Sequence, residues 1–69
     1  MRPRVRRDIG ALVRYVAERG GRCRREDLLD VVIDELGGRP EDLAPLLSEV
    51  VEAGFLVADL DFVRLPREQ

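Results

Sequence analysis

Glycines divide this chain into amphipathic segments, and that division constrains the fold more than any other feature of the sequence. Glycine pairs at 20–21 and 37–38 follow the first two segments, and Gly54 follows the third. Within each segment the apolar residues recur at helical spacing. Two short apolar runs, 55–58 and 62–65, close the chain. The pattern predicts three helices and a C-terminal β-hairpin, a mainly α fold of the α+β class.

The apolar stripes define the faces that we expect to be buried. The stripe of the first helix, predicted at 8–19, is Ile9, Leu12, Val13, Val16 and Ala17. The stripe of the second, predicted at 25–36, is Leu28, Leu29, Val32, Ile33 and Leu36. The stripe of the third is Leu43, Leu46, Leu47, Val50 and Val51. Pro45 lies early in the third segment, so we expect a tight first turn or a slight kink there, with the regular helix beginning near Asp42.

Composition excludes several classes of function. The sequence has no histidine and a single cysteine, Cys23, so a Cys/His zinc site, an intrachain disulfide and a histidine-dependent catalytic triad are all excluded. We therefore expect a protein that is not an enzyme and has no catalytic residue, metal ligand or cofactor.

Sixty-nine residues make one small domain. No apolar run is long enough for a membrane span and no signal sequence is evident, so we expect no membrane association and a cytoplasmic location.

Cys23 has two interpretations. It stands in a polar–apolar–polar triplet, which predicts a short strand at 22–24 with the thiol pointing inward as a small core residue. Its neighbours Arg22 and Arg24 would instead lower the pKa of the thiol if it were accessible.

The charges are strongly segregated along the chain. Residues 1–25 hold nine of the twelve arginines against two acids, a net charge of +7, whereas residues 26–69 have a net charge of −9. The overall charge of −2 therefore conceals a dipolar chain. Such asymmetry indicates a polyanion partner or a charged tail.

The stretch LAPLLSEVVEAGFLVADLDFVRL, residues 43–65, resembles the third helix of a winged helix-turn-helix domain running into its wing. CRREDLL is similar to the entry to the second helix of that family. The resemblance implies three helices, a short strand and a C-terminal wing within a winged-helix domain at 8–66. A basic N-terminal arm at 1–7 precedes it and a tail at 67–69 follows. It also implies a small transcriptional regulator that binds double-stranded DNA.

The outward residues of the predicted third helix differ from those with which this family usually binds base edges. Its outward positions are Glu41, Pro45, Ser48, Glu49 and Glu52. Base readout favours arginine, lysine, asparagine or glutamine, and glutamates would repel phosphates. We therefore expect DNA to be contacted at its phosphates, mainly by N-terminal arginines. The predicted contacts are Arg2, Arg4, Arg6, Arg7, Arg22, Arg24, Arg25 and Arg64.

Other interpretations remain open for these charges. The arm could be a solvated tail, and Arg22, Arg24 and Arg25 could form ion pairs with Glu26, Asp27 or the acidic second half of the chain. The acidic face of the third helix could bind a basic protein, or a second copy of the chain in a homodimer. Tyr15, off the apolar stripe, is then a candidate dimer contact; otherwise it is a half-buried residue at the edge of the core.

Overall fold

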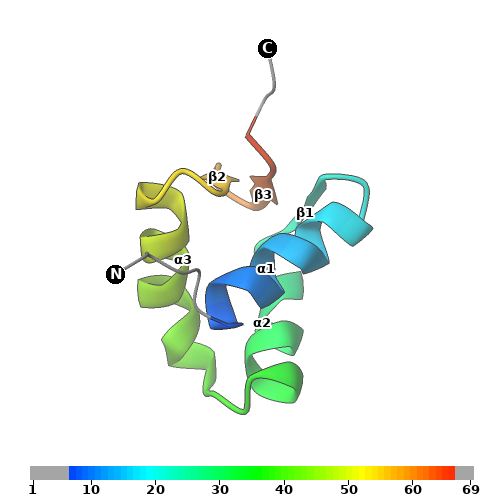
Figure 1. Cartoon of the computed structure of the whole chain (residues 1–69). Helices are drawn as coiled ribbons and strands as arrows, with labels where there is room; N and C mark the ends of the chain where they lie inside the picture. The colour runs from blue at the N-terminus through cyan, green and yellow to red at the C-terminus, as the bar shows by residue number, and fades with distance from the viewer. Residues whose placement is uncertain (1–6, 67–69) are drawn as a thin grey trace, which may run out of the picture.

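The first helix, α1, occupies Arg7–Glu18 in a computed structural model that describes residues 7–66 (Figure 1). Both of its ends lie within one residue of the predicted positions. Leu12 and Val16 are fully buried, as the apolar stripe predicts. Ala17 is exposed, so its predicted burial is wrong. The buried face of α1 is therefore narrower than its apolar residues alone predict.

The second helical segment changes geometry along its length. α2 covers Asp27–Asp30 and continues into a π-helical stretch, η1, at Val31–Glu35. The amide of Leu36 donates a hydrogen bond to the carbonyl of Val31, five residues back, over 3.0 Å. A π turn closes over one residue more than an α turn, so a stripe projected at α-helical spacing is displaced. Val31 is buried and Ile33 is 42% exposed, so the predicted burial of Ile33 is wrong.

A tight turn precedes the third helix, as the position of Pro45 predicts. It is a 3-10 turn, η2, at Pro40–Asp42, and α3 follows at Leu43–Glu52. Pro45 lies in the first turn of α3, where a backbone amide has no intrahelical acceptor, so the ring breaks no hydrogen bond. The buried residues of α3 are four of the five in the predicted stripe: Leu43, Leu46, Leu47 and Val50.

Three short strands form one antiparallel sheet. β1 covers Arg22–Arg24, β2 covers Val57–Ala58 and β3 covers Phe62–Arg64, in the order β1-β3-β2. The predicted hairpin is confirmed, although both of its strands are shorter than the apolar runs. Cys23 pairs with Val63 across the sheet, and both side chains are buried. The inner side of the sheet thus closes one end of the core.

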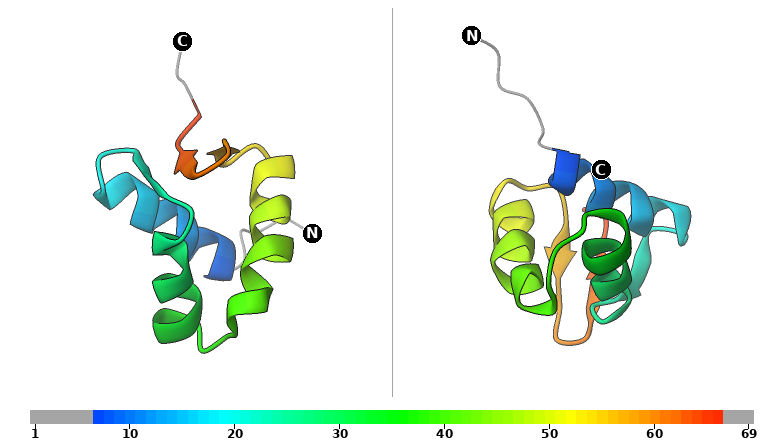
Figure 2. Two further views of the ribbon diagram at one scale, coloured as in Figure 1. Left: turned by 180° about the vertical axis from the view of Figure 1, so that it is seen from behind. Right: turned by 90° about the horizontal axis from the view of Figure 1, so that it is seen from below.

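The helices and the sheet enclose a single apolar core. α1 packs against η1, α3 and β1, and Figures 1 and 2 show the other two helical segments on either side of it. The buried residues are Ala11, Leu12, Val16, Cys23, Leu28, Val31, Val32, Leu43, Leu46, Leu47, Val50, Leu56 and Val63. No polar side chain is buried within residues 7–66. The fold is a compact α+β arrangement, and no helix among these residues has the length and apolar character to cross a membrane.

Candidate functional site

The outer side of the sheet brings together three of the arginines predicted to contact phosphates. Because Cys23 points into the core, its neighbours Arg22 and Arg24 point outward. Antiparallel pairing places Arg64 opposite Arg22. It also places Phe62 opposite Arg24. Directly paired residues share one side of a sheet, and we call Arg22, Arg24, Phe62 and Arg64 the arginine face.

The Phe62 ring lies close to both guanidinium groups of β1. The Cζ atom of Arg22 is 4.1 Å from the ring centroid, and the Cζ atom of Arg24 is 6.0 Å from it. A cation over an aromatic ring is attracted by the negative face of the π system. A phenyl ring is not a conventional hydrogen-bond acceptor, so this contact does not satisfy the five N–H donors of an arginine. Phe62 therefore orders arginines that can still bind an anion.

Two carboxylates border the arginine face. The Nη1 atom of Arg24 lies 3.3 Å from an oxygen of Glu26, which is one of the ion pairs that the sequence suggested. The Nε atom of Arg64 lies 3.7 Å from an oxygen of Asp59. All four side chains are at least 40% exposed, so water and salt screen both pairs. A phosphate could replace either carboxylate at small energetic cost.

The remaining predicted phosphate contacts lie at different places. The backbone amide of Arg25 donates to the carbonyl of Asp61 over 2.8 Å, which ties the beginning of α2 to the hairpin beside Phe62. Arg7 begins α1, at the opposite end of that helix from β1. The structure therefore groups Arg25 with the arginine face and separates Arg7 from it. Three predicted contacts lie outside the described residues: Arg2, Arg4 and Arg6.

The acidic face predicted for the third helix is exposed throughout, although Glu41 belongs to η2 and not to α3. It borders two different hollows. Pro45 and Glu49 line a groove toward α1. Ser48 and Glu52 line a shallower pocket that Arg25 also borders. The predicted positions thus divide between two surfaces.

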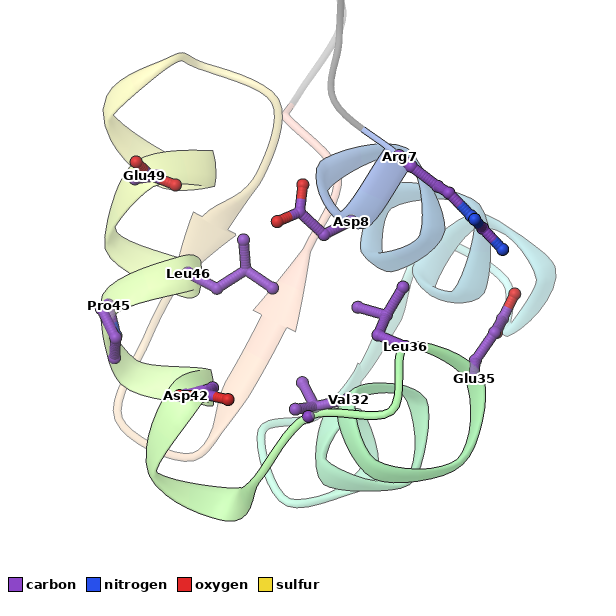
Figure 3. A pocket seen from close by; sticks show the side chains of 10 residues that line it. Arg7, Asp8, Val32, Glu35, Leu36, Asp42, Pro45, Leu46 and Glu49 are labelled. Carbon is purple, nitrogen blue, oxygen red and sulfur yellow. The ribbon is translucent and has the colours of Figure 1, made fainter.

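The larger hollow is a groove of about 760 Å³ between the beginning of α1, η1 and the beginning of α3 (Figure 3). Its apolar lining is Val32, Leu36, Pro45 and Leu46. Its carboxylates are Asp8, Glu35, Asp42 and Glu49. Arg7 is the basic residue that lines it among residues 7–66, and Gly38 completes the described lining. We call this hollow the acidic groove.

Carboxylates of the acidic groove come from all three helical segments. In Figure 3 the carboxylate of Asp8 points toward Leu46, and the Arg7 side chain points toward Glu35. Glu35 also accepts a hydrogen bond from the Nη2 atom of Arg14 over 3.1 Å. The sequence predicts the acidic side chains of α3, such as Glu49, but not the part played by Asp8 and Glu35. The local sequence pattern does not show that these three elements lie close together in the fold.

Cys23 is a small core residue. Burial raises the pKa of its thiol, and the negative charge of Asp27 raises it further, against a lowering effect of Arg19. The alternative of a lowered thiol pKa is therefore wrong. Desolvation outweighs the nearby positive charge because the side chain is only 7% exposed.

Tyr15 is half-buried and packs against the core. Its hydroxyl accepts a hydrogen bond from the Arg19 guanidinium, whose Cζ atom lies 4.6 Å from the ring centroid. The polar end of the ring thus has a partner within the same helical turn. A dimer contact at Tyr15 stays a prediction.

The described part of the chain contains no set of side chains that could bind a metal ion. Among residues 7–66, no group of three or more histidine, cysteine, aspartate or glutamate side chains is placed to hold a metal ion. The carboxylates of the acidic groove are spread around its rim in Figure 3.

Comparison with family models, with curated proteins and with solved structures gives no match to this chain.

Proposed function

We propose that this protein is a winged helix-turn-helix domain that binds double-stranded DNA through phosphate contacts of its arginine face. The order of elements supports the fold: helix, strand, two further helical segments and a C-terminal hairpin. So does the sheet order, in which β3 pairs with both β1 and β2. On this proposal the hairpin of β2 and β3 is the wing.

The observation that carries the proposal is the register between β1 and β3. It sets Arg22 opposite Arg64 and places Arg22 over the half-buried ring of Phe62. Guanidinium groups present several N–H donors in a planar fork that fits phosphate oxygens. An aromatic ring beside them adds a surface for a sugar or a base. Arg25 borders the same surface and supplies a further cation.

The mode of binding differs from base readout by a helix in the major groove. The exposed positions of α3 include Ser48, Glu49 and Glu52, and none of them carries a positive charge. Carboxylates on this helix would approach phosphates of like charge, so we place α3 away from the duplex. Binding would then depend little on sequence and steeply on salt.

The test is a fluorescence-polarisation titration of a labelled duplex with the full chain at 50 and 200 mM salt. Two or three phosphate contacts predict an affinity that falls by about tenfold or more between these salt concentrations. The affinity should be similar for two duplexes of unrelated sequence. Absence of binding at the lower salt concentration would overturn the proposal, as would strong discrimination between the duplexes.

A further inference from the structure

The pocket that Arg25, Ser48 and Glu52 border is a hollow of about 280 Å³ between the turn before α2, the helix α3 and the strand β2. The rest of its lining within residues 7–66 is apolar: Ala44, Leu47, Val51 and Ala58. We call this hollow the α3–β2 pocket. Ligand pockets measure about 300–1,000 Å³, so this one suits a small molecule and not a segment of a protein.

A cation and an anion border the α3–β2 pocket without a partner of opposite charge among residues 7–66. Neither the Arg25 guanidinium nor the Glu52 carboxylate forms an ion pair or a side-chain hydrogen bond with these residues, and the two do not pair with each other. Arg25 is half-buried and Glu52 is exposed, so a ligand from solution can reach both. Glu52 would repel an anion and Arg25 would repel a cation, whereas a ligand with both charges satisfies the two side chains.

The backbone that carries these side chains is held by hydrogen bonds. The amide of Arg25 donates to the carbonyl of Asp61 over 2.8 Å, and the carbonyl of Arg25 accepts from the amide of Leu28 over 3.0 Å. Glu52 is the last residue of α3 and lies one turn after Ser48, whose hydroxyl can donate or accept a hydrogen bond. Fixed backbone positions lower the entropic cost of binding a ligand.

The floor of the α3–β2 pocket is the edge of the apolar core. Leu47 is buried, Val51 and Ala58 are half-buried, and Ala44 is exposed. An aliphatic group that covers this floor contributes in proportion to the apolar area that it removes from water. A ligand for this pocket therefore combines a carboxylate, an ammonium group and a small aliphatic side chain.

We propose that the α3–β2 pocket binds a free α-amino acid with an aliphatic side chain, such as leucine. The carboxylate of the ligand pairs with Arg25, its ammonium group pairs with Glu52, and its side chain covers Ala44 and Val51. This binding goes beyond the proposed DNA contact and does not rest on it, because it is measured with no nucleic acid present.

The test is an NMR titration of the isotope-labelled full chain with L-leucine at constant salt and pH 7. We expect shifts of the amide signals around the pocket, such as those of Ser48 and Ala58, that saturate with a midpoint of about 1 mM, the weak affinity of a small ligand in an open hollow. Isocaproate lacks the ammonium group, isoamylamine lacks the carboxylate and glycine lacks the aliphatic group. Each of them should bind at least about fivefold more weakly than leucine.

Charge variants assign each end of the ligand. Arg25→Gln should weaken the binding of leucine and isocaproate about five- to tenfold and should not weaken that of isoamylamine. Glu52→Gln should weaken the binding of leucine and isoamylamine and should not weaken that of isocaproate. Arg39→Gln and Glu49→Gln make the same changes of charge outside the pocket lining and should leave leucine binding within about twofold of the native value.

A variant that fills the floor locates the aliphatic group. Ala44→Leu keeps every charge and extends an exposed side chain of α3 over the hollow. Leucine is a good helix former, so the variant should keep the fold, which its amide spectrum reports directly. Binding of L-leucine should fall at least about fivefold.

Four results would overturn the proposal. One is the absence of saturable shifts around the pocket on addition of L-leucine. Another is binding of isocaproate or isoamylamine as tightly as leucine, which would show a site for a single charge. The others are equal losses from Arg39→Gln and Arg25→Gln, which would show an effect of net charge alone, and unchanged binding by Ala44→Leu, which would place the ligand elsewhere.

Discussion

The guanidinium carbon of Arg22 lies 4.1 Å from the centroid of the Phe62 ring, although two helical segments, α2 with η1 and α3, and the 3-10 turn η2 separate their strands along the sequence. The pairing of β1 with β3 creates this contact, because Arg24 is the residue directly opposite Phe62 and Arg22 reaches the ring diagonally. One ring thereby orders two cations on an exposed surface. The contact links the fold to the proposed binding of DNA.

Replacing the ring should weaken DNA binding without changing its dependence on salt. Phe62→Ala removes the surface that orders Arg22 and Arg24 but leaves every charge in place. We expect the affinity for a duplex to fall about two- to fivefold, with an unchanged slope of log affinity against log salt. Phe62→Leu keeps the apolar bulk and should weaken binding nearly as much. An affinity that is unchanged in both variants would contradict the role assigned to the ring.

Removing a carboxylate that borders the arginine face should strengthen DNA binding. Glu26→Gln abolishes the exposed ion pair with Arg24, so the free energy of unfolding should change by less than about 0.5 kcal/mol. The affinity for a duplex should rise about two- to threefold at low salt, because a like charge has been removed beside the phosphates. Asp34→Asn makes the same change of charge on η1 and serves as the control. Equal gains from both variants would show an effect of net charge alone.

Core truncation should unfold a chain of this size. Leu12 is fully buried, and Leu12→Ala should lower the free energy of unfolding by about 2–5 kcal/mol. A core this small supplies only about 3–5 kcal/mol in total, so loss of the helical circular dichroism signal at 25 °C is expected. Leu60 is 91% exposed, and Leu60→Ala should change the free energy by less than about 0.5 kcal/mol. Urea denaturation that fails to separate the two variants would contradict the assigned core.

Cys23 should react slowly in the folded protein. Burial holds its pKa above the ordinary value, so the folded state favours the protonated thiol. This contribution to stability is present below the unfolded pKa, about 8.5, and is lost as the pH rises from there through the folded pKa. The native chain should therefore lose more stability between pH 8 and 10 than Cys23→Ala does. Labelling by a disulfide reagent at pH 8 should be slow until urea unfolds the chain, and equally fast labelling with and without urea would contradict burial.

The sequence predicts the helices and the hairpin well because glycines and apolar spacing are local signals. Pro45 even predicts the tight turn that precedes α3. Ile33 is the clearest error, since a π-helical stretch cannot be recognised from apolar spacing when α-helical geometry is assumed. Element type is encoded locally, whereas helix geometry depends on packing.

The binding surfaces were only partly predictable. Arg22 and Arg64 were both predicted contacts, but their adjacency depends on the pairing of β1 with β3, which no local pattern specifies. The acidic groove requires Asp8 and Glu35 to converge with Glu49 from three separate helical segments. Composition supplies the charges, and tertiary packing decides which of them act together.

The most direct test of the proposed function compares two single variants in the duplex titration. Arg22→Gln removes a cation of the arginine face, and Arg39→Gln removes an exposed cation that pairs with Glu41 before α3. We predict that Arg22→Gln lowers the magnitude of the slope of log affinity against log salt by about 0.9, whereas Arg39→Gln leaves it unchanged. Equal slopes for the two variants would contradict phosphate binding by the arginine face.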